Sequence, residues 1–391
     1  MSNWKLIPLK DITLKIGSRA TPKGGGDAYK EFGISLIRSQ NVLKMVFSKD
    51  GLAFIDEKQA HDLRNVIVET SDVLLNITGD SVARCCMVPD YTLPARVNQH
   101  VCIIRANKRK LDPHFLMYSL NFHKEDLLSL SEIGATRRAL TKTMVEDFQI
   151  NLPAIEDQKS IAEVLRSLDD KIDLLHKQNQ TLEQLAETMF RHLFLDVPSD
   201  SEEISLIDLA SHIKDGVNPN RFPETLFYHY SLPAFDNGRQ PEKVYGKSIL
   251  SNKYVVSSGD ILVSKLNPRT PRIWHVGEAE KSSICSTEFQ VYKPKKKEYA
   301  EFVYCMLSST ETRDILAAAS SGTSGSHQRV TPDVINQLSI KRPDENSLRV
   351  FHQQAKEWFL KVSSNVKHIQ LMQQTRDTIL PKLMSGVISV I

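Results

Sequence analysis

The fold of this chain is indicated by residues 158–194, QKSIAEVLRSLDDKIDLLHKQNQTLEQLAETMFRHLF, in which apolar residues recur at alternating steps of four and three. They are Ile161, Leu165, Leu168, Ile172, Leu175, Leu182, Ala186, Met189 and Leu193, with Asn179 at one position of the same series. This spacing is the heptad pattern of a long helix that packs along another helix. We therefore predict a long helix here and a second helix as its partner.

A matching pattern lies 190 residues further along the chain, so that position 351 corresponds to position 161. The same series there reads Phe351, Ala355, Trp358, Val362, Asn365, Ile369, Met372, Arg376, Ile379 and Leu383. A buried asparagine is costly unless a polar group faces it, so Asn179 and Asn365 should meet. An antiparallel register, in which paired residue numbers add up to 544 as 179 and 365 do, achieves this. In that register Arg376 faces Leu168, and we expect its charged end to reach solvent.

The segments before the two helices also repeat each other. Residues 71–75 match residues 259–263, each a turn that leads into a short β-rich stretch, and residues 96–104 match residues 284–292. We predict a mixed α/β (α+β) fold of two globular domains in tandem, each followed by a long helix. The two helices are expected to form an antiparallel coiled coil with pseudo-two-fold symmetry. The expected regions are 1–152 (first domain), 153–198 (first helix and linker), 199–342 (second domain) and 343–391 (second helix).

Composition narrows the class of protein. The 391 residues allow two domains with connectors, and 50 basic against 47 acidic residues give a net charge of only +3. Any nucleic-acid surface must therefore be local. Five cysteines without CxxC or zinc-ligand spacing suggest a reducing compartment. The first residues lack a signal-peptide pattern and no apolar run is long enough to span a membrane, so a cytoplasmic protein is expected.

Catalytic motifs are missing from the sequence. Residues 23–26 (KGGG) lack the spacing of a phosphate-binding loop, and the patterns HExxH, GxSxG and GxGxxG do not occur. An adenine methyltransferase would carry an Asn-Pro-Pro-aromatic tetrapeptide and a glycine-rich cofactor loop, which are also missing. We therefore expect no enzymatic activity, no metal site and no cofactor in this chain.

Polar clusters suggest that the chain reads a ligand. Arginine, glutamine and asparagine form paired hydrogen bonds with guanine and adenine, and loop glycines let the backbone come close to a ligand. The candidates in the first half are Arg38, Ser39, Gln40, Asn41, Thr78, Arg84, Thr136, Arg137 and Arg138, with Lys108 in a basic turn. Those in the second half are Lys265, Asn267, Arg269, Arg272, His327, Gln328 and Arg329, with Lys296 in the equivalent basic turn. Each cluster also has a plainer interpretation, as a capped turn or as a solvated loop or hairpin tip.

Four stretches carry a resemblance to a known family: residues 37–41 (IRSQN), 98–101 (NQHV), 134–137 (GATR) and 152–158 (LPAIEDQ). Together with the tandem plan, they resemble the DNA-specificity subunit of type I restriction-modification enzymes over essentially the whole chain. The second helix junction departs from the pattern, because residues 342–346 read RPDEN.

The resemblance implies that each domain is a target-recognition domain, which reads one part of a bipartite, asymmetric site in double-stranded DNA. A helix of about 36 residues is roughly 55 Å long, a length that suits an unread spacer of fixed size. The family further implies two modification subunits that bind S-adenosylmethionine and methylate adenine, and restriction subunits that use Mg and ATP to translocate and cleave DNA.

Two other classes remain as alternatives. One is a coiled-coil adaptor that binds only proteins, and the other is a self-contained methyltransferase fusion. On the preferred hypothesis Lys108 and Lys296 contact phosphates. Bases are contacted in the first half by Arg38, Gln40, Asn41 and the loop 136–138, and in the second half by Lys265, Asn267, Arg269, His327, Gln328 and Arg329.

Overall fold

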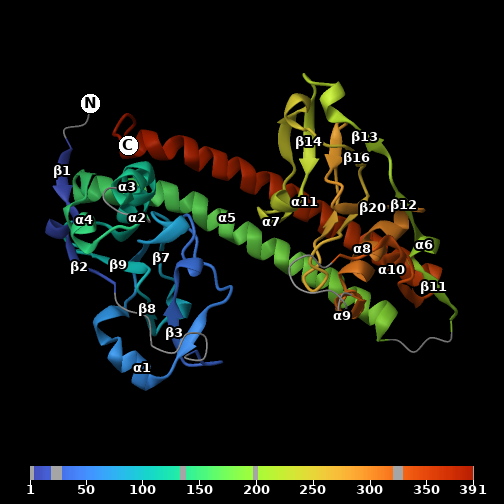
Figure 1. Ribbon diagram of the computed structural model, residues 1–391, viewed down its shortest axis with the longest axis horizontal. Coiled ribbons are helices and arrows are strands. Elements are labelled where there is room, and N and C mark those ends of the chain that lie inside the picture. Colours follow the sequence, from blue (N-terminus) through green and yellow to red (C-terminus); the bar gives the residue numbers. More distant parts are fainter. Residues whose placement is uncertain (1–3, 19–28, 133–137, 197–200, 320–328, 391) are drawn as a thin grey trace. The chain divides into compact units, whose positions relative to one another are not determined.

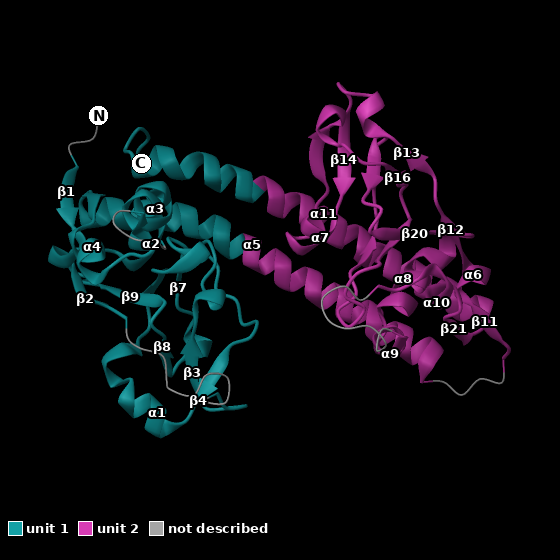
Figure 2. Ribbon diagram, in the orientation of Figure 1, with its two compact units in different colours: residues 1–171, 372–391 teal, residues 172–371 magenta. Residues whose placement is uncertain are grey.

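The computed structural model describes residues 4–18, 29–132, 138–196, 201–319 and 329–390 (Figure 1). The chain forms two compact units, residues 1–171 with 372–391 and residues 172–371 (Figure 2). Each unit has its own globular part and includes one portion of each of two long helices, α5 (Ile155–Phe190) and α11 (Glu345–Met384). The predicted mixed α/β fold, with a long helix after each globular part, is confirmed.

The globular part of the first unit is mainly β-structure covered by short helices. Its strands are β1 (Lys5–Pro8), β2 (Thr13–Gly17), β3 (Ile34–Ile37), β4 (Ala53–Ile55), β5 (Ile67–Val68), β6 (Val73–Asn76), β7 (Cys85–Met87), β8 (Ala95–Val97), β9 (Val101–Ala106) and β10 (Gln149–Leu152). Its helices are α1 (Glu57–Asp62), α2 (Pro113–Phe122), α3 (Lys124–Ser131) and α4 (Lys142–Asp147), with 3-10 turns at Leu9–Asp11, Ser39–Asn41, Arg64–Val66, Gly79–Ser81 and Asp90–Thr92.

Strand β6 lies at the centre of this globular part because every one of its side chains is buried. Val73 and Leu75 pack into a core that includes Leu116 of α2, whereas Leu74 points into a second core with Leu36 of β3. This alternation is what a strand with both faces covered requires. One sheet has the order β2-β9-β6-β7 and is antiparallel, and another has the order β4-β3-β8-β5 with β3 and β8 parallel. Strands β1 and β10 pair antiparallel beside the start of α5.

The globular part of the second unit follows the same plan. Its strands are β11 (Glu203–Ser205), β12 (Ala210–Ile213), β13 (Gly216–Val217), β14 (Leu226–Tyr230), β15 (Glu242–Tyr245), β16 (Lys253–Val255), β17 (Ile261–Ser264), β18 (Ile273–His275), β19 (Ser283–Cys285), β20 (Phe289–Pro294) and β21 (Ser339–Lys341). Its helices are α6 (Leu206–Leu209), α7 (Leu232–Asp236), α8 (Ala300–Ser308), α9 (Thr310–Ala319) and α10 (Pro332–Asn336), with 3-10 turns at Pro219–Arg221, Gly246–Ser248 and Lys297–Tyr299.

The sheets of the second unit repeat the strand order of the first, with one additional strand, β13. They run β12-β20-β17-β18, β13-β16-β19-β14-β15 and β11-β21, and the pair β14 and β19 is again parallel. Strand β17 takes the place of β6, with Ile261 and Val263 in one core and Leu262 in another. The weak sequence repeat therefore corresponds to a repeat of the fold.

The long helices bury part of the apolar series that the sequence indicated, whereas Leu168, Trp358 and Ile379 are only partly buried. In the first unit, Ile161 and Leu165 of α5 share a core with Leu380 and Leu383 of α11. In the second unit, Ala186 of α5 shares a core with residues of α11, including Phe351 and Ala355. The packing explains the length of the helices, because most helical stability in proteins comes from burying one face.

The two asparagines of the heptad series lie opposite each other in the second unit. Nδ2 of Asn365, which is fully buried, donates to Oδ1 of Asn179 and to Oε1 of Gln178, both at 2.8 Å. Further along, the rings of Phe190 and Phe351 lie 6.0 Å apart. Because residue numbers rise along α5 while they fall along α11, the two segments run antiparallel within this unit.

Two details of the helices differ from the sequence expectations. Arg376 does not reach solvent: it is 8% exposed and binds Asp169 and Asp377. At the end of α5, Phe190 and Phe194 are more deeply buried than the predicted seam residues Met189 and Leu193, and residues Arg191–Leu195 form a π-helical turn.

Replacing Asn365 by leucine should lower the free energy of unfolding by about 1–3 kcal/mol, because the Asn179 amide would then face hydrocarbon. The double change Asn179→Leu with Asn365→Leu should recover much of the loss. Urea unfolding measures the free energy of unfolding of the single and the double variant. Gln354→Leu, at an exposed position of the same helix, serves as the control. Equal losses in the single and double variants would contradict the pairing argument.

Candidate nucleic-acid interface

Residues 38–51, here called loop 38–51, follow strand β3 and are held together by Asn41. Its Oδ1 accepts from the Arg38 backbone N–H at 3.0 Å, and its Nδ2 donates to the carbonyl oxygens of Ser48 at 3.0 Å and Asp50 at 3.2 Å. Asn41 is fully buried. Its side chain therefore supports the loop from inside, which differs from the base contact expected from the sequence.

Arg38 and Gln40 lie at the rim of loop 38–51. Nη2 of Arg38 donates to the carbonyl oxygen of Gly51, and its guanidinium lies 5.1 Å from the ring centre of Tyr29. Nε2 of Gln40 donates to the same carbonyl at 3.2 Å, and the Gln40 side chain is exposed. Gly51 has a φ of 61°, and a Cβ there would lie 2.3 Å from Gln40 Nε2. Nε2 of Gln40 also donates to Asp50 O at 3.3 Å, so the backbone orients both side chains, and a base contact by Gln40 would share these N–H groups.

Loop 38–51 is also joined to strand β6. Nδ2 of Asn76, at the end of that strand, donates to the backbone oxygens of Ser39 at 2.9 Å and Val42 at 3.1 Å. The backbone of Asn76 also accepts from Ala83 and donates to Arg84, whose side chain is exposed. The loop and the turn that carries Arg84 are therefore fixed to one buried residue.

Beyond β6 lies a group of polar residues that we call the first polar edge: Thr78, Gln99, His100 and Arg138. Thr78 Oγ1 lies 2.5 Å from His100 Nδ1, and Gln99 Nε2 lies 3.2 Å from His100 Nε2. Arg138 forms an ion pair with Glu132 at 2.7 Å. Thr136 and Arg137 lie outside the described residues.

The second polar edge is formed by Lys265, Asn267, Glu288 and Arg329. Its backbone makes the same hydrogen bonds and bridges as that of the first polar edge, and we call this shared arrangement the backbone frame. The Leu140 N–H donates to Ile77 O at 2.8 Å in the first unit, and the Val330 N–H donates to Lys265 O at 2.9 Å in the second. Isolated bridges join Thr78 with Ala139, and Leu266 with Arg329, at equivalent points. Gly79 and Asn267 also occupy equivalent turns, with φ values of 74° and 55°.

The side chains on the second frame differ from those on the first. Lys265 Nζ donates to Thr287 O at 2.6 Å, and burial lowers the pKa of Lys265. Arg329 pairs with Glu288 at 3.2 Å. Arg272 is held in two hydrogen bonds by Asp236, at 2.7 and 2.8 Å, and these bonds raise its pKa. Arg269 and Asn267 are exposed, whereas His327 and Gln328 lie outside the described residues.

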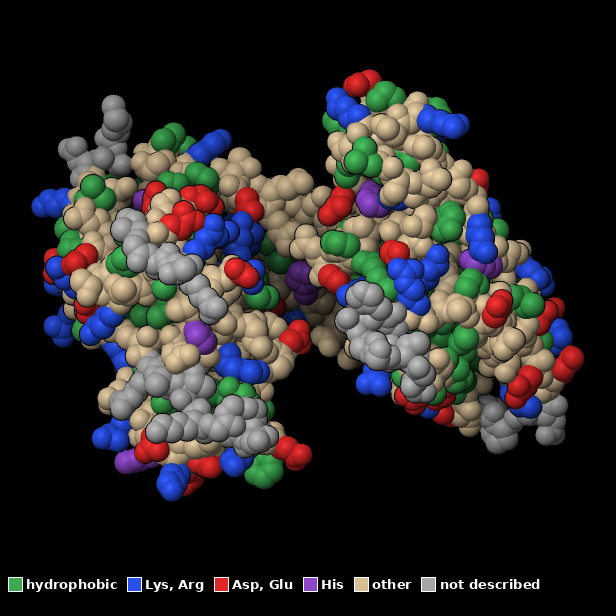
Figure 3. All heavy atoms as spheres, in the orientation of Figure 1, with side chains coloured by type: hydrophobic (Ala, Val, Ile, Leu, Met, Phe, Trp, Pro, Cys, Tyr) green, Lys and Arg blue, Asp and Glu red, His purple; other side chains and the backbone are tan. Residues whose placement is uncertain are grey.

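The basic turns are only partly available to a ligand. Arg105 binds Asp72 through two hydrogen bonds of 2.8 Å, and this partner raises the pKa of Arg105. Lys108 and Lys296 are exposed, with Lys108 Nζ 3.4 Å from Ser71 Oγ. On the face in Figure 3, basic and acidic side chains are interspersed, in keeping with the small net charge.

Gln99, His100 and Glu288 belong to the polar edges but were not among the predicted site residues. A signal for them was present in the repeat, because residues 98–100 and 286–288 both follow a short strand and precede the strand that pairs with β6 or β17. In both turns the first side chain accepts from the third N–H: Asn98 from His100 at 3.0 Å, and Ser286 from Glu288 at 3.3 Å.

The arrangement is suited to hydrogen bonding. Among the described residues, no group of three or more His, Cys, Asp or Glu side chains is placed to hold a metal ion. The five cysteines are free and buried, and burial raises the pKa of Cys86 and Cys102 to about 12. No helix in the described part of the chain has the length and hydrophobicity to cross a membrane. The described side chains of the two polar edges thus offer different hydrogen-bonding groups on a repeated backbone.

Comparisons with known proteins find similarity to one family. Residues 1–184 match the family model of the type I restriction modification DNA specificity domain. The chain is 27% identical over 284 residues to the type I restriction enzyme MjaIX specificity subunit of Methanocaldococcus jannaschii, a match that covers 66% of this chain and 64% of that subunit. It is 27% identical over 199 residues to the HindI specificity subunit of Haemophilus influenzae, which covers 50% of this chain and 42% of the relative.

The fold is also similar to that of a solved structure. The S subunit of a type I restriction-modification system from M. genitalium aligns with a TM-score of 0.61 and 15% identity, over 97% of this chain and 96% of that chain. The chain is therefore similar in sequence to DNA-specificity subunits of type I restriction-modification enzymes, and similar in fold to one solved S subunit. It spans less than two thirds of the length of the two curated relatives named here.

Proposed function

We propose that this chain is the non-catalytic DNA-reading subunit of a type I restriction-modification complex. Residues 1–152 and 199–342 are the two target-recognition domains, and each reads one part of a bipartite, asymmetric site. The chain directs partner subunits to that site in the reducing cytoplasm, in keeping with its five free cysteines.

The observation that carries this proposal is the repeated backbone frame of the two polar edges. The frame is the same, as the equivalent bonds of Leu140 to Ile77 and of Val330 to Lys265 demonstrate, but the side chains on it differ. A frame that is kept while its hydrogen-bonding groups change supports the reading of two different base sequences, because side-chain identity decides which base edge is recognised.

Roles within the interface follow from exposure. Gln40, whose amide also donates to Asp50 O and Gly51 O, and Arg84 in the first half, and Asn267 and Arg269 in the second, are exposed and are our candidates for base contact. Arg38, Arg138, Lys265, Arg272 and Arg329 already have protein partners and are proposed to contact DNA through their remaining N–H groups, together with Ser39 and Thr78. Lys108 and Lys296 are proposed to bind phosphates, a contribution that weakens as salt is added.

The long helices have two proposed roles. As an antiparallel coiled coil they keep the two recognition domains apart, so that the spacer of the site has a fixed length. They also bind two modification subunits, which supply S-adenosylmethionine and methylate adenine, while restriction subunits use Mg and ATP for translocation and cleavage.

The proposal is tested by incubating DNA and labelled S-adenosylmethionine with the modification subunit alone, with this chain alone and with both. Label should enter DNA efficiently only when both proteins are present. If label entered DNA with this chain alone, a methyltransferase fusion would be favoured. If both proteins together methylated DNA without sequence preference, a protein-only adaptor would be favoured.

A further inference from the structure

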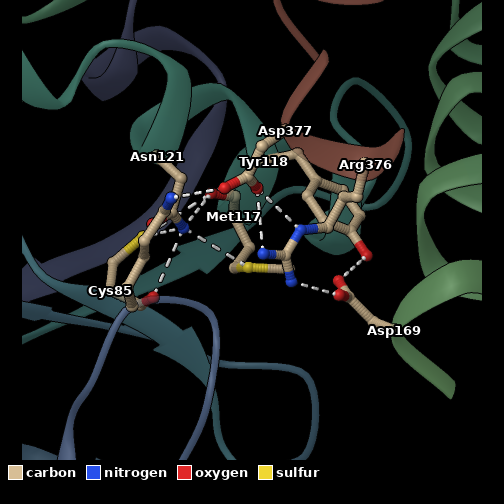
Figure 4. Close-up of polar contacts among 8 residues, drawn as sticks. Cys85, Met117, Tyr118, Asn121, Asp169, Arg376 and Asp377 are labelled. Atoms are coloured by element: carbon tan, nitrogen blue, oxygen red, sulfur yellow. Dashed lines mark hydrogen bonds and ion pairs between the residues drawn. The ribbon is translucent and has the colours of Figure 1, made fainter. Parts of the chain in front are cut away.

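Arg376 on α11 links two carboxylates in the first unit (Figure 4). Its Nη1 binds Oδ1 of Asp169 on α5 at 2.7 Å, and its Nη2 binds Oδ1 of Asp377 at 2.9 Å. Only 8% of Arg376 is exposed. A planar guanidinium holds two acceptors in fixed directions, which the single ammonium of a lysine does not do.

Each carboxylate reaches a different part of the globular portion of the same unit. Asp169 Oδ2 accepts from the Tyr118 hydroxyl at 2.6 Å, and Tyr118 is a buried residue of α2. Asp377 Oδ2 binds Lys44 Nζ at 3.2 Å, and Lys44 belongs to loop 38–51. We call Arg376, Asp169, Asp377, Tyr118 and Lys44 the Arg376 network.

A backbone connection joins the same loop to α2. The Met45 N–H donates to Cys85 O at 2.9 Å, and Asn121 Nδ2 donates to the same oxygen at 3.3 Å. Asn121 Nδ2 also donates to Met117 O at 2.9 Å, within the helix that carries Tyr118 (Figure 4). Loop 38–51 is therefore tied to Arg376 by two routes, one through Lys44 and one through α2.

Within the Arg376 network, the pKa shifts of Arg376 and Asp377 favour their charged forms. Burial works against the charge of Arg376, but Asp169 and Asp377 outweigh it and raise the pKa of Arg376. Burial likewise acts to raise the pKa of Asp377, but Arg376 and Lys44 lower it. Because Arg376 and Asp377 both stay ionised, the hydrogen bonds between them persist across the neutral pH range.

The positions that correspond to Arg376 and Asp169 carry apolar residues in the second half, where other polar contacts, such as that of Arg239 with Glu183, join the long helices to the globular part. A shift of 190 residues places Ala186 and Phe359 at the positions of Arg376 and Asp169, and both of these residues are buried apolar side chains. The repeated fold therefore accepts apolar side chains at the two positions that Arg376 and Asp169 occupy in the first unit. A buried ion pair adds little net stability to a protein. Its geometry is directional, however, so its main contribution here is to position the groups that it joins.

We propose that Arg376 is a positioning residue for DNA specificity, which orients loop 38–51 relative to α5 and α11 through the Arg376 network. The inference rests on the proposed function, because loop 38–51 carries Arg38 and Gln40. If the loop is held rigidly on the helices, DNA whose spacer differs by one base pair does not fit. If the loop is loosened, the spacer requirement relaxes.

The test uses the complete complex with its modification subunits and the variants Arg376→Gln and Asp169→Asn. Initial methylation rates are measured on DNA with the native spacer and with spacers one base pair shorter or longer. The ratio of native to altered-spacer rates should fall about tenfold in both variants. Asp170→Asn, at the neighbouring carboxylate that makes an exposed pair with Arg166, is the matched control and should keep the wild-type ratio.

Two further measurements keep the inference falsifiable if Arg376→Gln folds poorly. Lys44→Met changes an exposed network residue and should lower the same ratio in a folded protein. Hydrogen exchange of the backbone amides in loop 38–51 should be faster in Asp169→Asn than in Asp170→Asn. A folded Asp169→Asn or Lys44→Met variant with the wild-type spacer ratio would overturn the inference while the proposed function stands. A wild-type complex that methylates no bipartite site would instead contradict the proposed function and the inference together.

Discussion

Replacing Gln40 by alanine is expected to relax recognition of one base pair in one half of the DNA site. A side chain that makes two hydrogen bonds to a base discriminates by about 1–3 kcal/mol, or roughly 10- to 100-fold in relative rate. Gln40 is exposed at the rim of loop 38–51, and its amide is oriented by Gly51 O at 3.2 Å. Methylation rates of the complete complex on DNA substituted at each position of the site measure the effect.

The control variants separate base reading from general damage. Gln149→Ala removes an exposed glutamine from β10 and should leave every rate unchanged. Arg269→Ala should relax a position in the other half of the site, because Arg269 belongs to the second unit. Rates that fall equally for all sequences in Gln40→Ala would assign Gln40 to the support of the loop and contradict base reading.

Between pH 6.5 and pH 4, the second unit should lose about 3 kcal/mol of stability through His275 alone. The ring of His275 packs 5.7 Å from Tyr304 and 5.2 Å from Phe359, and its buried Nε2 finds no hydrogen-bond partner among the described residues. Burial lowers its pKa from 6.5 to about 4. Unfolded protein therefore binds a proton in this range that folded protein excludes, so stability falls as the pH falls.

Urea unfolding followed by tryptophan fluorescence at a series of pH values measures this loss. His275→Gln removes the titrating group and should flatten the pH dependence, whereas His368→Gln, at an exposed position of α11, should not. His229, whose pKa burial and Lys253 lower to about 4, adds to the loss in the same direction. A pH profile of His275→Gln as steep as that of the wild type would contradict the assignment.

The sequence predicted features that depend on periodicity, and it failed where tertiary contacts decide. The heptad spacing predicted two long helices, and the cost of a buried amide placed Asn179 opposite Asn365. The partners of Arg376 were not predictable, because Asp169 stands outside the heptad series and Lys44 lies far away in the chain. An arginine among apolar positions was therefore assigned to solvent by default.

The interface shows the same division. Gln40 and Arg84 are exposed in polar turns as their sequence context suggested, whereas Asn41 in the same stretch is the buried centre of its loop. Adjacent polar residues look alike in a sequence, and only the folded loop decides which amide faces Ser48 and Asp50 and which faces outward. His100 became a candidate only when the structure placed its ring 2.5 Å from Thr78.

The most direct test of the central claim is a genome-wide map of methylated adenine in cells that express this chain with an active modification subunit. Cells that express the same modification subunit without this chain provide the comparison. We predict a new bipartite motif with a gap of fixed length that appears only when this chain is present. An active, expressed modification subunit and no new motif would contradict a role in DNA specificity and favour a protein-only adaptor.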